Sequence, residues 1–150
     1  MMQLARWVVA VPAGLGAAVS TFFLLSFVFS IAHGFDAVAA FWAAPDMNGM
    51  PIAGTYIIFG TRAITAAVLV AVIAKIVPAH HRHVAVASGC VVGVLSFVLF
   101  AYVTRTVVAM DMSLTMGMWY RNILELVSLL AGSAIGAAMG SDPDKTRTTD

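Results

Sequence analysis

The chain has 150 residues, of which 61% are hydrophobic and only 10% charged, and its mean hydropathy is +0.97. This composition lies far outside the range of soluble globular proteins and predicts an integral membrane protein, with the lipid bilayer as its first partner. The eight Lys and Arg residues are too few and too scattered to form a nucleic-acid-binding surface. The single cysteine, Cys90, excludes an intramolecular disulfide.

Four long apolar stretches predict an all-α bundle of four transmembrane helices in a single domain, residues 1–140. The expected spans are residues 7–32, 55–77, 84–108 and 119–140. The apolar part of the first span is about twice as long as that of a signal peptide, so we expect the span to be retained. Residues 141–150 are polar and contain Pro143, and we expect them to form a disordered cytoplasmic tail.

The loop between the first two spans, residues 33–54, is too long for a simple turn. Asp36 is a suitable N-cap for a short helix that Pro45 would end. Phe41 and Trp42 belong to this segment, and aromatic side chains favour the headgroup zone of a bilayer. The loop therefore predicts a short interfacial helix on the outer side.

Basic residues give the expected orientation. Arg6, the pair Lys75 and Arg82, and the pair Lys145 and Arg147 fall on one side of the predicted bundle. The loops of the other side carry acidic residues instead. Because cytoplasmic loops are enriched in Lys and Arg, both termini are expected in the cytoplasm, and the inner (plasma) membrane of a bacterium is the expected location.

Small residues recur at helical spacing in three spans and predict close helix packing. These residues are Gly14 with its alanine neighbours in the first span, Gly89 and Gly93 in the third, and Gly132, Gly136 and Gly140 in the fourth. With cytoplasmic termini, all of them lie in the inner half of the membrane. We therefore expect a bundle that is narrow on the cytoplasmic side and wider on the outer side.

The fourth span carries the best candidate site. At 100° per residue, Arg121, Glu125 and Ser128 share one face with the glycine row. Glu125 lies six residues below the outer start of its span and Arg62 seven below that of the second span, so the two have similar depth. The predicted intramembrane polar site consists of Glu125, Arg62, Arg121, Asn122 and Ser128. It would serve either as a proton or substrate relay or as a structural ion pair.

Methionines on the outer side are the second candidate site. Thioethers are soft ligands that prefer Cu(I), and this weaker interpretation makes copper the one expected metal. The alternative is that flexible methionines simply fill irregular packing. The candidate ligands are Met47, Met50, Met110, Met112, Met116, Met118 and His33.

Two functional hypotheses follow. The first is a non-catalytic membrane subunit or oligomerising component, which packs against itself or a larger membrane assembly through its small-residue faces. The second is a small transporter that uses Glu125 and Arg62 at a cavity open to the outer side. No catalytic residues are predicted.

The orientation is testable by cysteine labelling in intact cells. Asn48→Cys should react with a membrane-impermeant thiol reagent, whereas Thr148→Cys should not, because Asn48 is expected outside and Thr148 inside. The parent chain, with Cys90 alone, gives the background. The opposite labelling pattern would contradict the orientation.

Overall fold

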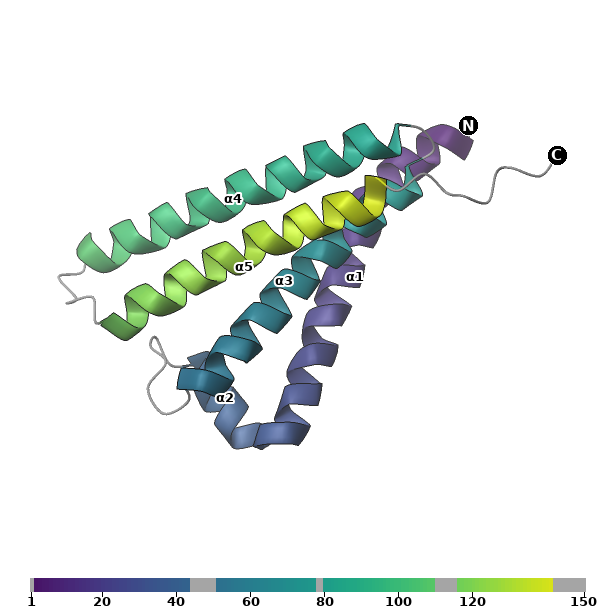
Figure 1. The fold of residues 1–150 in the computed structure, drawn as a ribbon. Coiled ribbons are helices and arrows are strands. Elements are labelled where there is room, and N and C mark those ends of the chain that lie inside the picture. The colour runs from purple at the N-terminus through teal and green to yellow at the C-terminus, as the bar shows by residue number, and fades with distance from the viewer. Residues whose placement is uncertain (1, 44–50, 78–79, 110–115, 142–150) are drawn as a thin grey trace.

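The computed structural model describes residues 2–43, 51–77, 80–109 and 116–141. This part of the chain forms five helices and contains no strand (Figure 1). They are α1 (Met2–His33), α2 (Phe35–Ala43), α3 (Pro51–Ile76), α4 (His81–Ala109) and α5 (Met116–Ser141). All except α2 are long and apolar enough to cross a membrane, which confirms the predicted all-α membrane bundle.

Each predicted span lies almost wholly within one long helix. The helices extend beyond the predicted starts by several residues, because polar residues near an interface still have helical backbone and only the hydropathy falls off there. Of the predicted tail, residues 141–150, Ser141 is instead the last residue of α5, and residues 142–150 lie outside the described residues.

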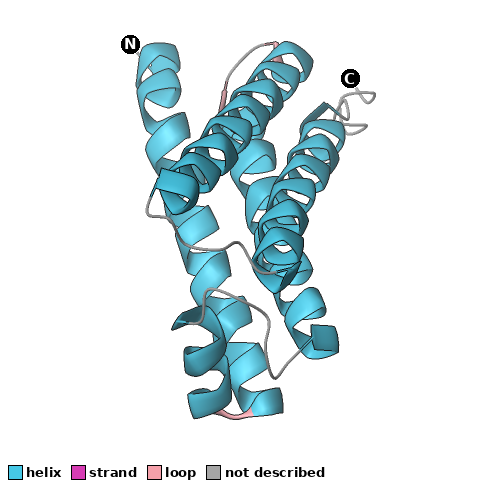
Figure 2. Cartoon of the chain, turned by 90° about the vertical axis from the view of Figure 1, so that its left-hand side faces the viewer, coloured by secondary structure: helices cyan, strands magenta, loops and turns pink. Residues whose placement is uncertain are grey.

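Helix α3 is the centre of the bundle. It packs against both α1 and α5, and α4 lies mainly on α5. Half of the apolar window of α3 is buried (50%), compared with 11% in α1 and 17% in α4. Figure 2, turned by 90° from Figure 1, shows the long helices running along one general direction. The two outer helices therefore leave most of their apolar side chains exposed on the surface of the bundle.

The glycine row of α5 packs on an alanine row of α3. A Cβ atom on Gly136 would lie 2.5 Å from the carbonyl oxygen of Ala67, and a Cβ on Gly132 would collide with the backbone of Ala63. One turn farther on, Gly140 lies against the side chains of Ala74 in α3 and Ala85 in α4. Only the absence of side chains allows the two backbones to approach this closely.

The other predicted packing glycines also face helices of the same chain. Gly89 of α4 lies against the backbone of Ser133 in α5, and Gly93 lies against Leu130. Gly14 of α1 lies against Ile73 of α3. The small-residue positions that were predicted to pack are therefore occupied by contacts within the chain.

The bundle is narrow at one end and wide at the other. Figure 1 shows α1 and α3 close together where α1 begins and α3 ends, and apart where α2 lies between them. The contacts of Gly136 and Gly140 lie toward the narrow end, whereas Gly132 meets Ala63 midway along α3. At the wide end, bulky side chains fill the space between the helices. Val38 and Phe41 of α2 form a buried cluster with Ile57 and Ile58 of α3.

The close contact predicts that side chains cannot be added to the α5 row. Gly136→Leu should lower the stability of the protein by about 1–3 kcal/mol or more, because the new side chain meets backbone atoms that cannot rotate away. Gly16→Leu is the matched control, since a Cβ on Gly16 of α1 has no neighbour within 4 Å. Thermal unfolding in mild detergent measures both, and equal effects would mean that α5 does not pack on α3.

Candidate functional site: an ion group at the wide end of the bundle

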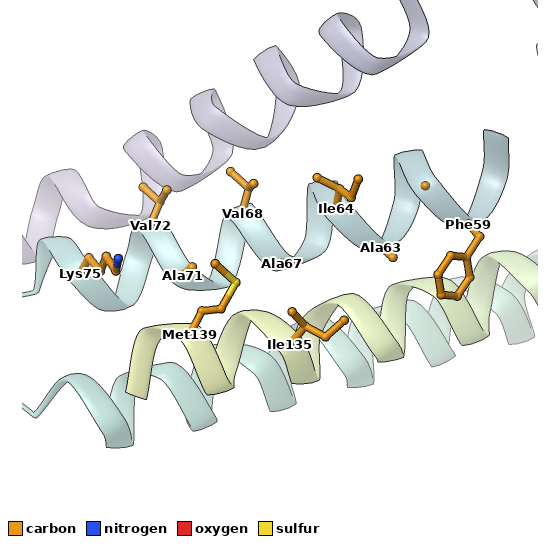
Figure 3. A pocket seen from close by; sticks show the side chains of 11 residues that line it. Phe59, Ala63, Ile64, Ala67, Val68, Ala71, Val72, Lys75, Ile135 and Met139 are labelled. Atoms are coloured by element: carbon orange, nitrogen blue, oxygen red, sulfur yellow. The ribbon is translucent and has the colours of Figure 1, made fainter. Parts of the chain in front are cut away.

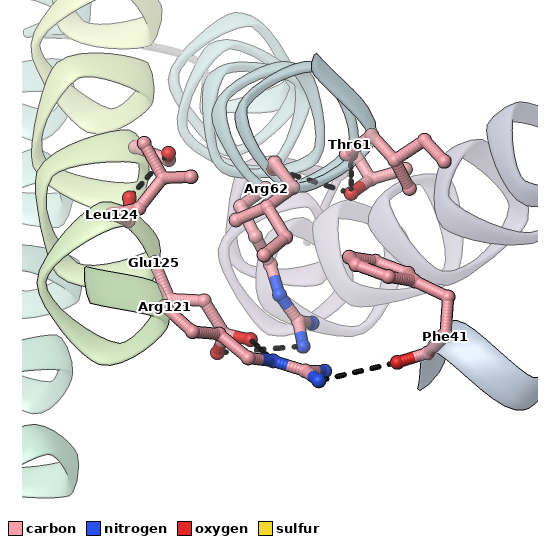
Figure 4. A network of polar contacts seen from close by, with 9 residues as sticks. Phe41, Thr61, Arg62, Arg121, Leu124 and Glu125 are labelled. Atoms are coloured by element: carbon pink, nitrogen blue, oxygen red, sulfur yellow. Dashed lines mark hydrogen bonds and ion pairs between the residues drawn. The ribbon is translucent and has the colours of Figure 1, made fainter. Parts of the chain in front are cut away.

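Three charged side chains meet at the wide end. One carboxylate oxygen of Glu125 lies 3.7 Å from Nη2 of Arg62, and the other lies 3.4 Å from Nε of Arg121. Arg62 comes from α3, whereas Arg121 and Glu125 lie one turn apart on α5 (Figure 4). We call these three side chains the ion group. The pairing of Arg62 with Glu125 was expected from their equal depth, and Arg121 is a second partner.

Arg121 is the anchored member of the ion group. Its side chain is only 10% exposed, and Nε donates a hydrogen bond of 3.4 Å to Glu125. Nη1 donates to the carbonyl oxygen of Phe41 in α2 at 3.2 Å, and the guanidinium lies 5.2 Å from the centre of the Phe41 ring. Charge, hydrogen bond and ring contact together join α5 to α2.

Arg62 is held differently. Its guanidinium lies 5.5 Å from the ring centre of Phe22 in α1 and 5.3 Å from that of Trp42 in α2. Within the described residues it makes no hydrogen bond, and its distance of 3.7 Å to Glu125 is too long for one. The side chain is 32% exposed. Two rings and a loose ion pair therefore hold Arg62 in place, and its N–H donors have no hydrogen-bond acceptor in the part of the chain that the structure describes.

Other buried polar atoms around Arg62 also have no hydrogen-bond partner among the described residues. They are Nε of Arg62 itself, Nε1 of Trp42, Oγ1 of Thr65 and Oγ of Ser26. Thr65 is three residues from Arg62 on α3, so both share one face. In the antiparallel α1–α3 pair, Gly14 meets Ile73 and Phe29 meets Gly60, which sets Ser26 level with Arg62. Four of the five such atoms in the described part of the chain thus lie at or near the level of Arg62, and the fifth, Oγ1 of Thr104, lies in α4.

The remaining members of the predicted site do not join the ion group. Ser128 is fully buried, but its hydroxyl donates to the carbonyl oxygen of Leu124 in its own helix at 2.5 Å. Asn122 is half-buried, and no hydrogen bond joins it to the described residues. The position of Ser128 on this face of α5 was predicted, but its hydroxyl group is used within its own helix.

The predicted copper site is described only in part. Met47, Met50, Met110 and Met112 lie outside the described residues, and Met116 begins α5 without a described side chain. Met118 is buried, whereas His33 is exposed at the end of α1. Among the described residues no group of His, Cys, Asp and Glu is arranged to hold a metal ion. Copper binding by thioethers stays a prediction.

The role of α2 was missed by the sequence reasoning. Phe41 and Trp42 were expected to contact headgroups, but Phe41 is buried and both rings contact the arginines. The sequence did contain a signal for these contacts. Arg62 and Arg121 lie at the same depth as Phe22, Phe41 and Trp42, and guanidinium groups stack favourably on aromatic rings.

The comparisons with known proteins identify no relative of this chain. No protein-family model matches the chain, and no significantly similar curated protein or solved structure was found.

The geometry predicts unequal effects of removing the charges. Glu125→Leu should reduce stability more than Arg62→Leu, because it leaves two guanidinium groups without their shared carboxylate, whereas Arg62→Leu leaves Glu125 with Arg121. Adding Arg62→Leu to Glu125→Leu should recover part of the loss, with a coupling of about 0.5 kcal/mol or more.

The control for this cycle is Arg105→Leu, which removes an exposed arginine of α4. Combined with Glu125→Leu, it should show simple addition of the two effects. Thermal unfolding of the three single variants, the two double variants and the wild type in one detergent gives the comparison. Additivity of Arg62→Leu with Glu125→Leu would mean that these two charges do not interact.

Proposed function

We propose that the protein binds a small anionic solute at Arg62 and moves it across the membrane as a small transporter. The observation that carries the proposal is the state of Arg62: a partly exposed guanidinium, stacked on two rings, with no hydrogen bond among the described residues. Charged side chains in spans are costly, and those that persist there commonly belong to ion or substrate pathways. A purely structural arginine would be expected to have its donors paired, as Arg121 does.

The charge of the ion group selects the solute. Two arginines and one glutamate give the ion group a net charge of +1. The unpaired nitrogen atoms, Nε of Arg62 and Nε1 of Trp42, are donors only, and the nearby hydroxyl groups can also donate. A carboxylate or a phosphate offers the acceptors that such donors lack, and guanidinium groups bind both in a bidentate manner. A cation would meet repulsion from this excess positive charge, and the one carboxylate of the ion group, Glu125, is already paired with both arginines.

An exchange of ion-pair partners at Arg62 would couple anion binding to a change in the bundle. An anion at Arg62 competes with Glu125 for the guanidinium, and Glu125 retains Arg121 as its partner at 3.4 Å. The Arg62–Glu125 contact links α3 to α5 at the wide end, so its release would loosen that end. The contacts of Gly136 and Gly140 toward the narrow end keep the two helices together. Binding would thus change the wide end while the narrow end stays closed.

The orientation of the site follows from the basic residues. With both termini in the cytoplasm of a bacterium, the wide end and the ion group face the outer side of its inner (plasma) membrane. A solute would then reach Arg62 from outside the cell.

A second candidate function is that of a non-catalytic subunit, which oligomerises or joins a larger membrane assembly. The observation that favours it is the low burial of α1 and α4, whose outer faces offer long apolar surfaces. The small-residue faces do not add to this support, because they are used within the chain. Mass measurement of the protein extracted in mild detergent would reveal a stable partner.

The anion proposal is tested by ligand-induced stabilisation. The unfolding temperature is measured with acetate, inorganic phosphate and chloride at equal ionic strength. A series of monovalent cations, measured in the same way, is the reference for effects that are not specific to anions. At least one anion should raise the unfolding temperature of the wild type, because a ligand that binds the folded state stabilises it, by about 2.7 kcal/mol at 100 times its Kd. Arg62→Leu should abolish the rise.

Arg105→Leu is the matched control, since it removes an exposed arginine from α4 and should leave the rise intact. Uptake of the same anion by vesicles that contain the purified protein separates transport from binding. A rise that survives in Arg62→Leu, or stabilisation by cations instead of anions, would contradict the proposal.

A further inference from the structure

A groove of about 480 Å³ follows the seam between α3 and α5, and no member of the ion group lines it. Its floor is made by small residues of α3, and its rims are the larger side chains of α3 and α5. Figure 3 shows Phe59 and Lys75 at its two ends, with Ile135 and Met139 on the α5 side. The floor consists of Gly60, Ala63, Ala67 and Ala71.

The groove is a consequence of the glycine contacts. The alanines that accept the close approach of α5 are too small to fill the space beside the seam, whereas Ile64, Val68 and Val72 project along its edge. The lining is therefore almost wholly apolar, which excludes a polar solute as occupant. An acyl chain has the matching shape and polarity.

One end of the groove is charged. Of the eleven lining residues only Lys75 carries a charge, and it is exposed in the last turn of α3, at the narrow end of the bundle. Arg82 follows in the first turn of α4. A basic site beside transmembrane helices on the cytoplasmic side attracts the headgroups of anionic lipids.

We propose that this groove binds an acyl chain of an anionic phospholipid whose phosphate lies at Lys75. Half of a hydrocarbon core is about 15 Å thick. At 1.5 Å per residue, a chain that enters beside Lys75 passes Val72, Val68 and Ala67 before it reaches mid-membrane. The inner half of the groove has the length for this chain. The proposal does not depend on the solute site at Arg62.

A second copy of the protein is the less favoured occupant. Two copies with the same orientation in the membrane that docked by this face would bring two Lys75 side chains to the same depth, where they repel each other. Nothing else that lines the groove compensates that charge. A lipid phosphate neutralises it directly.

The test is native mass spectrometry of the full chain in mild detergent, with phosphatidylglycerol and phosphatidylcholine of identical acyl chains added separately. The wild type should retain one phosphatidylglycerol molecule at concentrations where phosphatidylcholine is lost. Lys75→Gln should weaken phosphatidylglycerol binding about fivefold and remove the preference, because one lysine contributes about that factor near a membrane surface. Val68→Phe should weaken binding of both lipids by filling the groove.

Two variants of α4 serve as matched controls: Arg105→Gln for the charge and Val94→Phe for the bulk, since Val94 is 63% exposed away from the groove. Both should bind lipid as the wild type does. Lys75 is exposed, so its variant tests the proposal even if Val68→Phe fails to fold. Equal retention of the two lipids, no retained lipid, or a lipid-free dimer that Val68→Phe dissociates would each overturn the proposal.

Discussion

The backbone contact between α3 and α5 is the constraint on which the rest of the structure depends. It exists because Gly132, Gly136 and Gly140 have no side chain where the alanines of α3 approach. In lipid, where apolar side chains gain little by leaving the solvent, such close van der Waals contact is a main source of helix association. The contact closes one end of the bundle. It also leaves beside the seam the groove that ends at Lys75.

The opposite end is held by charge and aromatic contacts instead of close packing. Arg62, Arg121 and Glu125 join α3 to α5, and the rings of Phe22, Phe41 and Trp42 join both arginines to α1 and α2. Such contacts tolerate changes of distance better than interlocked backbones, because ion pairs weaken gradually with separation. A protein that opens for a solute would be expected to open here. The two halves of the bundle thus differ in chemistry and in the freedom to move.

Much of this arrangement is predictable from the sequence, for identifiable reasons. Helix geometry alone puts the glycine row and Arg121 on one face of α5, and residue counting from the span ends puts Arg62 level with Glu125. The partner of the glycine row could not be predicted, because alanines are common in every span and those of α3 carry no distinctive signal. The hydrogen bond from Arg121 to the Phe41 carbonyl could not be predicted either, since a backbone acceptor exists at every residue. The aromatic residues of α2 were assigned to headgroups because aromatic side chains are equally typical of both settings.

The central claim, that an anion binds at Arg62, is tested most directly by the fluorescence of Trp42, whose ring lies 5.3 Å from the guanidinium. Trp7→Phe and Trp119→Phe together leave Trp42 as the one tryptophan. Titration with the stabilising anion should change its emission in a saturable manner, and Arg62→Leu should abolish that change. An emission that stays constant while the anion stabilises the protein would place the anion elsewhere and contradict the account.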